Sequence, residues 1–209
     1  MDKKIFRDIS YGMYVVSSKD SGCVINTLTQ VTSENPVITI SLNKENYTND
    51  VIKKENTFIV SIISENVDKN IISIFGFQSS KDVDKFKEFE YETINDTKVL
   101  KDTIGYLVCE VINIVDSGTH DIFVAKVIDT KKNNDDVPMT YKYYHEVIKG
   151  KAPSKAPTYI DEKEEGYVCD VCGYVHKGEL TDDFVCPICG VDVSHFKKKW
   201  LFTFFIDIF

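Results

Sequence analysis

The stretch that decides the fold of the C-terminal part of the chain is residues 167–191, YVCDVCGYVHKGELTDDFVCPICGV. It contains two C-x-x-C pairs, Cys169 with Cys172 and Cys186 with Cys189. Two such pairs are a strong signal for a tetrahedral metal site, because each turn presents two thiolates and two facing turns supply four sulfurs. Four sulfurs suit zinc or a single iron ion, so the spacing predicts a metal site without choosing the metal.

Glycine and aromatic residues surround these cysteines. Gly173 and Gly190 each follow the second cysteine of a pair, where glycine lets the backbone fold round a sulfur and direct amide N–H groups at it. Such hydrogen bonds help to set the potential of an iron–thiolate centre. A module this small needs its metal to fold. We expect a small aromatic core from Tyr167, Tyr174, Phe184 and Phe196, and we expect His176 and His195 to be surplus as ligands.

The segments YVCDVCGYVH and DDFVCPICGV resemble the two iron-binding turns of rubredoxins, in order. The spacer between them is shorter than in free rubredoxins and is similar to that of the compact rubredoxin-like domain of rubrerythrins. The resemblance implies one iron ion held by Cys169, Cys172, Cys186 and Cys189, cycling between ferrous and ferric states. The alternative is a four-cysteine zinc ribbon that only stabilises the module.

Composition places the chain among ordinary globular proteins. It has 209 residues, of which 43% are hydrophobic and 28% charged, and a net charge of −8. The acidic balance argues against nucleic acid as a partner. The start, MDKKIFRDIS, lacks the apolar segment of a signal peptide, so we expect a cytoplasmic protein. The remaining cysteines, Cys23 and Cys109, lie in apolar runs and are expected to be inert core residues, with a redox role as the alternative.

Residues 1–148 predict a mainly β domain with helical insertions, in an antiparallel barrel rather than a parallel doubly wound sheet. Strands are expected at residues 13–18, 23–32, 37–42, 58–64, 103–118 and 120–132. One helix should begin at Thr48 as N-cap and another should end near Gly76. A third, amphipathic helix is expected over SKDVDKFKEF, with Val83, Phe86 and Phe89 on one face.

The composition changes near residue 149. Residues 149–166 are rich in charge and contain Pro153 and Pro157, so we expect a linker, followed by the metal module at 167–199. If flexible, this linker would span roughly 20–25 Å, enough for the small module to swing against the larger domain. The tail WLFTFFIDIF at 200–209 is apolar but about half the length of a membrane helix. It could be a strand on another surface, an atypical end without function, or a membrane contact; we expect no membrane partner.

Polar residues stand where two expected strands end. Asn26, Thr27 and Gln30 interrupt one apolar run, and Ser41, Asn43 and Lys44 end the next, just before Thr48. Amide and hydroxyl groups can pair with the polar edge of a flat heteroaromatic ring, and a helix N-terminus can hold a phosphate. By themselves, the same residues could simply end strands and cap a helix.

Residues 5–147 resemble the flavin reductase-like, FMN-binding split-barrel family. The resemblance rests on YGMYVVSS, VINTLTQVT, SLNKENYT, IFGFQSSKDVDKF and the strand pair joined through SGTHDIFVAKV. Ala125 and Ser80 stand where the family more often has glycine. The resemblance implies that Asn26, Thr27 and Gln30 lie along the isoalloxazine, that Ser41, Asn43, Lys44 and Thr48 hold the ribityl phosphate, and that His120 lies near the nicotinamide. It also implies a homodimer.

A flavin domain followed by a rubredoxin-like domain resembles the high-molecular-weight rubredoxins of anaerobic bacteria. That resemblance implies an oxidoreductase that passes electrons from NAD(P)H through FMN to the iron and on to an acceptor, such as a flavodiiron protein that reduces O2 or NO. Two alternatives remain. The chain could be an electron carrier reduced by a separate rubredoxin reductase, or a flavin-binding protein with a structural zinc ribbon.

Overall fold

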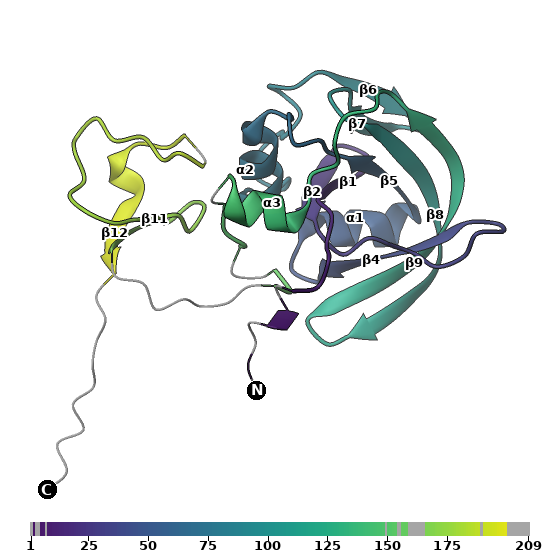
Figure 1. Cartoon of the computed structure of the whole chain (residues 1–209). Helices are drawn as coiled ribbons and strands as arrows, with labels where there is room; N and C mark the ends of the chain where they lie inside the picture. Colours follow the sequence, from purple (N-terminus) through teal and green to yellow (C-terminus); the bar gives the residue numbers. More distant parts are fainter. Residues whose placement is uncertain are drawn as a thin grey trace, which may run out of the picture.

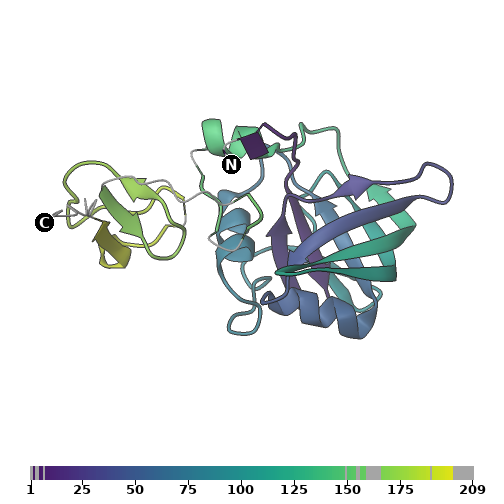
Figure 2. The same cartoon turned by 90° about the horizontal axis from the view of Figure 1, so that it is seen from below.

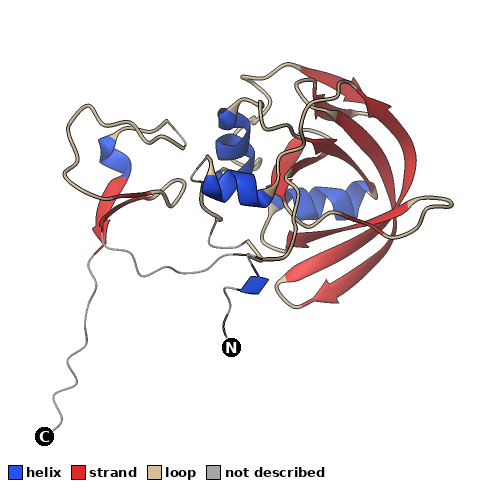
Figure 3. Ribbon diagram, viewed as in Figure 1, coloured by secondary structure: helices blue, strands red, loops and turns tan. Residues whose placement is uncertain are grey.

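The computed structural model describes residues 2, 5–6, 8–148, 150–153, 156–158, 166–188 and 190–199. Its main feature is a seven-stranded antiparallel sheet that curves into an incomplete barrel (Figures 1 and 3). In spatial order its strands are β2 (Ser21–Ile25), β1 (Tyr14–Ser18), β5 (Thr57–Ile62), β8 (Gly105–Ser117), β9 (His120–Lys132), β4 (Val37–Asn43) and β3 (Thr29–Gln30). The expected mainly β, antiparallel fold is confirmed.

Buried and half-buried residues alternate along strands such as β4, and this alternation explains how the sheet encloses an apolar core. In β4, Ile38, Ile40 and Leu42 are buried while the residues between them are half-buried. Successive side chains of a strand point to opposite faces, so all three enter the barrel interior. There they meet Phe58 of β5 and Phe123 of β9, each of which is fully buried.

In the part of the chain that the structure describes, three α-helices lie outside the sheet: α1 (Tyr47–Glu55), α2 (Lys69–Phe77) and α3 (Tyr141–Glu146). Figure 2 shows α1 across one end of the curved sheet, with α2 and α3 on the side nearer the C-terminal module. A second core forms between α2, α3 and the strands, where Phe75 and Phe86 meet edge to face with ring centroids 4.9 Å apart.

Two local expectations for residues 23–48 were wrong in detail. The run expected as one strand at 23–32 is divided into β2 and β3, because the Thr27 hydroxyl hydrogen-bonds the backbone of Ser41 and takes residues 26–28 out of the ladder. The N-cap of α1 is Asn46, whose side chain accepts from the Thr48 amide at 3.0 Å, and not Thr48 itself. The other five expected strands are present: β9 has the expected bounds, and the ends of β1, β4, β5 and β8 differ from the expected ones by at most two residues.

Residues 80–89 form turns and not the expected amphipathic helix. The carboxylate of Asp84 accepts from the Phe86 amide at 3.1 Å, which competes with helical hydrogen bonding. Phe86 and Phe89 still join the second core, whereas Val83 is 41% exposed. A hairpin of β6 (Tyr91–Ile94) and β7 (Thr97–Leu100), absent from the sequence expectations, follows these turns.

The C-terminal module contains a three-stranded sheet in the order β11 (Val175–His176), β10 (Gly166–Cys169) and β12 (Phe196–Lys199), with a 3-10 turn at Val193–His195. Its aromatic core contains Phe184 between Phe196, at 5.3 Å, and His176, at 4.4 Å. Tyr174 also packs on Phe196, but Tyr167 lies under the Lys198 ammonium. Among the described residues, no helix combines the length and apolarity needed to cross a bilayer. The apolar tail at 200–209 lies outside the described residues.

Candidate functional site

Three cysteines converge at one end of the C-terminal module. Cys169, Cys172 and Cys186 are at most 2% exposed, and their sulfur atoms all lie within 4.8 Å of one another. The Cys172 and Cys186 sulfurs are 3.5 Å apart. A tetrahedral ion with metal–sulfur bonds of about 2.3 Å needs sulfurs about 3.8 Å apart, so the described thiols fit such an ion. Cys189, the expected fourth ligand, lies outside the described residues.

The two cysteine turns repeat the same backbone hydrogen bonds. The Gly173 amide donates to the Cys169 carbonyl at 2.9 Å, and the Gly190 amide donates to the Cys186 carbonyl at 3.0 Å. Both glycines have positive φ, 75° and 72°, which residues with a Cβ rarely adopt. The glycine amides therefore close the turns that present the sulfurs, which explains why glycine follows each C-x-x-C pair.

Both histidines of the module have partners away from the sulfurs, as expected. His176 hydrogen-bonds the Glu179 carbonyl at 3.1 Å. His195 lies 3.0 Å from the carboxylate of Asp170, which also pairs with Lys197 at 2.9 Å. Hydrogen bonds from Lys197 and then His195 lower the pKa of Asp170, so this carboxylate beside Cys169 is ionised at neutral pH.

The N-terminus of α1 carries two buried polar atoms that lack a partner among the described residues. They are the hydroxyl oxygen of Thr48 and the side-chain oxygen of Asn49, and both residues are 0% exposed. A buried polar atom without a hydrogen bond costs about 1–3 kcal/mol, so a site of this kind fits a ligand that supplies the bond. The helix N-terminus adds amide donors and a partial positive charge that suit a phosphate.

Asn43 and His120 are direct partners in the β4–β9 ladder, so the sheet brings two expected site residues together. The His120 Nδ1 atom lies 2.9 Å from the Thr119 hydroxyl, while its Nε2 atom is buried and has no partner among the described residues. Burial lowers the pKa of His120, which favours a neutral ring at pH 7. A neutral ring with one open nitrogen can donate or accept a hydrogen bond to a ligand.

Charged residues fix the same corner of the barrel. The Lys44 ammonium lies 2.6 Å from the Asp116 carboxylate, and Lys53 lies 2.6 Å from Asp121. Burial alone would raise the pKa of Asp121, but hydrogen bonds from Lys53 and Asn49 and the charge of Lys44 bring it below its ordinary value. Asp121 is therefore a buried anion that holds β9 against α1.

The expected site residues do not all lie at this corner. Thr27 does, because its hydroxyl bonds both the N–H and the C=O of Ser41. Gln30 does not: its amide donates to the Thr32 carbonyl, and it lines a separate, largely apolar hollow of about 670 Å³ with Tyr14 and Leu107. The Asn26 amide donates to the hydroxyl of Thr158, a residue of the expected linker, at 3.3 Å.

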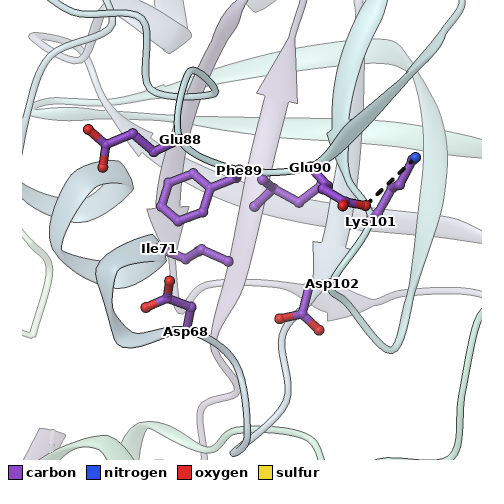
Figure 4. Close-up of a pocket in the computed structure, with 8 residues that line it drawn as sticks. Asp68, Ile71, Glu88, Phe89, Glu90, Lys101 and Asp102 are labelled. Atoms are coloured by element: carbon purple, nitrogen blue, oxygen red, sulfur yellow. Dashed lines mark ion pairs between the residues drawn. The ribbon is translucent and has the colours of Figure 1, made fainter.

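A smaller hollow of about 390 Å³ lies beside α2 and contains none of the expected site residues (Figure 4). Four carboxylates surround Ile71 and Phe89 there, and Glu90 pairs with Lys101 at 3.9 Å. Nothing in its lining matches the chemistry expected of the chain.

Sequence reasoning missed several residues that structure the site. Asp121 could have been suspected, because it directly precedes the apolar run at 122–125, whereas Asn49 stands between two polar residues. Thr158 and Phe77 gave no local signal. Phe77, at the end of α2, packs against the cluster of Cys169, Cys172, Cys186 and Ile188.

Comparison with known families supports both halves of this description. Residues 6–150 match the flavin reductase like domain, and residues 167–197 match the rubrerythrin, rubredoxin-like domain. These matches imply a flavin in the first domain and iron in the second, in agreement with the orphaned polar atoms at α1 and with the converging thiols.

The chain is 33% identical to the high molecular weight rubredoxin of Moorella thermoacetica over 95% of its own length and all of the relative. It is 35% identical to the ferric-chelate reductase (NAD(P)H) of Archaeoglobus fulgidus over 78% of this chain and all of that protein. A solved structure, the NADH:FAD oxidoreductase from Streptomyces globisporus C-1027, shares the fold with a TM-score of 0.61 at 21% identity, covering 66% of this chain and 85% of that one. The chain therefore belongs to the flavin reductase-like family and, with its rubredoxin-like second domain, to the group of high molecular weight rubredoxins.

Proposed function

We propose that the chain is an oxidoreductase that takes electrons from NAD(P)H through FMN and passes them to an iron ion held by Cys169, Cys172, Cys186 and Cys189. The observation that carries this proposal is the packing of the cysteine cluster against α2 of the flavin reductase-like domain, which joins the two domains at the metal end. Flavin supplies the change from two-electron to one-electron transfer when bound. The final acceptor is a flavodiiron protein or another redox partner.

Each group of residues has a proposed role. Asn43, Lys44, Thr48 and Ser41 hold the phosphate end of FMN at the start of α1, where Thr48 offers an unsatisfied hydroxyl. Asn26 and Thr27 contact the ring system, whereas Gln30, which lines the separate hollow beside Tyr14 and Leu107, has no role in this assignment. His120 faces the nicotinamide, with the open Nε2 atom as its contact.

Two further properties belong to the same proposal. The chain works in the cytoplasm of an anaerobe, with the cysteines kept reduced or metal-bound. It forms a homodimer, supported by three apolar residues of the β8–β9 hairpin, Ile112, Val115 and Ile128, which are 56%, 44% and 51% exposed. Sedimentation over a range of protein concentrations tests the dimer, and a monomer throughout would contradict it.

An anaerobic titration of the purified protein with NADH and with NADPH, followed by its visible spectrum, tests the electron path. We expect the flavin and ferric–thiolate bands to bleach together. The matched variant Cys172→Ser should keep the flavin band and lose the ferric–thiolate band. If neither nucleotide bleaches the flavin, direct reduction is wrong, and adding a rubredoxin reductase then tests the carrier alternative. A colourless, zinc-loaded module would contradict the iron centre.

A further inference from the structure

Two faces of α2 make different kinds of contact. Ile71 and Phe75 lie four residues apart and enter the second core, where both are 1% exposed. Successive residues of a helix are rotated by about 100°, so Phe77 lies about 200° from Phe75 and cannot enter the same core. Phe77 packs instead against the cluster of cysteines and Ile188 in the C-terminal module. Both views show α2 on the side of the domain nearer that module (Figures 1 and 2).

A second, independent contact holds the segment that leads to the module. Thr158 is only 4% exposed, although it lies in the stretch expected to be a linker. Its hydroxyl lies 2.5 Å from the Tyr141 hydroxyl on α3 and 3.3 Å from the Asn26 amide. Gly150 is also buried, and its carbonyl lies 2.7 Å from the His145 ring. Thr158 is therefore attached to the first domain, at a point close in sequence to Gly166, where the module begins.

We propose that the C-terminal end of α2, with Phe77 as its apolar anchor, is the docking surface for the rubredoxin-like module of the same chain. The contact places the side of the module that carries the thiolates, rather than its charged edge strand β12, against the flavin reductase-like domain. The contacts of Thr158 raise the effective concentration of the module at this surface, because they fix a point of the chain only a few residues before the module begins.

The role of this docking in electron transfer rests on the function proposed above. When FMN and iron are bound, the flavin would supply single electrons and the ferric ion would accept one at a time, and the docked contact would hold the thiolates of Cys169, Cys172 and Cys186 towards the flavin reductase-like domain. The docking itself does not depend on that reaction and can be measured in the oxidised protein.

The test uses the full-length, metal-loaded chain and the variant Phe77→Ala. Hydrogen exchange of peptides covering residues 77–80 and 186–188 reports docking directly. We expect exchange in both peptides to accelerate about tenfold, the usual effect of truncating an interface anchor. Stopped-flow mixing with NAD(P)H should show slower reduction of iron by flavin, while reduction of the flavin by the nucleotide is unchanged.

Two control variants separate docking from folding. Phe77→Leu keeps an apolar anchor and should restore most of the protection. Val83→Ala removes an exposed apolar side chain beyond α2 and should change neither readout. Unchanged exchange in Phe77→Ala would overturn the docking surface. If Phe77→Ala accelerates exchange but the wild-type iron is never reduced from the flavin, the docking surface stands and the proposed electron path fails.

Discussion

The Asn26 side-chain amide donates a hydrogen bond to the Thr158 hydroxyl at 3.3 Å, although 132 residues separate them in sequence. This bond joins the segment before the metal module to a residue expected to contact the flavin ring. Thr158→Val keeps the size of the side chain and removes the hydroxyl, leaving the Asn26 amide and the Tyr141 hydroxyl without this partner. We expect faster limited proteolysis within residues 150–166 and little change in FMN affinity.

The comparison variant for this bond is Asn26→Ala. It removes the same hydrogen bond and also the proposed contact with the ring, so it should increase proteolysis and weaken FMN binding together. Equal FMN affinities for the wild type and Asn26→Ala would contradict the contact between Asn26 and the ring. Unchanged proteolysis in both variants would show that the hydrogen bond between Asn26 and Thr158 does not protect this segment.

Thr48 offers a direct test of the phosphate site. Thr48→Val preserves shape and removes the buried hydroxyl that has no partner among the described residues. Because a hydrogen bond to a charged group contributes about 1.5–3 kcal/mol, the dissociation constant of FMN should rise by about 10-fold to 100-fold. Riboflavin, which lacks the phosphate, should bind both proteins equally in a fluorescence-quenching titration. The matched control is Thr39→Val, on β4, which should leave the affinity for both ligands unchanged. If Thr48→Val weakens the binding of FMN and riboflavin equally, Thr48 contacts a part of the flavin other than the phosphate.

Removal of a metal ligand should affect only one domain. Cys172→Ser removes one of the converging sulfurs, and a module of this size relies on its metal to fold. We expect loss of iron and complete exchange of module amides, with the thermal unfolding of the barrel unchanged. Cys109→Ser is the opposite case: Cys109 is 0% exposed in the barrel core, and burial raises the pKa of its thiol to about 12. It should lower barrel stability and leave iron content unchanged.

Because of Lys85, the free energy of unfolding of the barrel should vary with pH in the alkaline range. Its ammonium group is buried and donates to the carbonyls of Gly22 at 2.8 Å and Phe75 at 3.2 Å, and burial lowers its pKa to about 8. In the unfolded chain the pKa of lysine is about 10.4. Between these values the unfolded state binds more protons than the native state, so stability rises with pH across the window and is lost as pH falls towards 8.

The variant Lys85→Met removes this titration. Urea titrations below pH of about 8 and near pH of about 10 give the unfolding free energies of the wild type and the variant. The difference between the two proteins should change by up to about 3 kcal/mol from one pH to the other, since each pKa unit corresponds to about 1.4 kcal/mol. The same pH slope in both proteins would show that Lys85 is not the titrating group.

Local periodicity was enough to predict most of the barrel. The strand expected at 120–132 has the same bounds as β9, because a run of apolar and β-branched residues follows the turn at Gly118. The helix expected at 80–89 failed because Phe86 and Phe89 have helical spacing but reach the core through turns fixed by Asp84. The β6–β7 hairpin was missed because its turn uses Asn95 and Asp96 at positive φ, without the glycine that usually signals such a turn.

The candidate site also has some features that the sequence predicts and others that it does not. The cysteine spacing specified the metal module directly, since the ligands of each pair lie within one turn. The flavin residues were identified by resemblance, and the structure shows Thr27 with Ser41 and Asn43 with His120 as neighbours while placing Gln30 in another hollow. Contacts such as Phe77 with the cysteine cluster join distant segments, and no local pattern encodes them.

The opposed faces of α2 have a consequence for how such a fusion can evolve. Phe75 contributes to the stability of the first domain, and Phe77, two residues later, contributes to its contact with the second. Substitutions at the end of the helix can therefore change the fit to a different small electron carrier without lowering the melting temperature of the barrel. A lineage that exchanges one such carrier for another needs to adapt a single helical turn and can keep the rest of its catalytic domain.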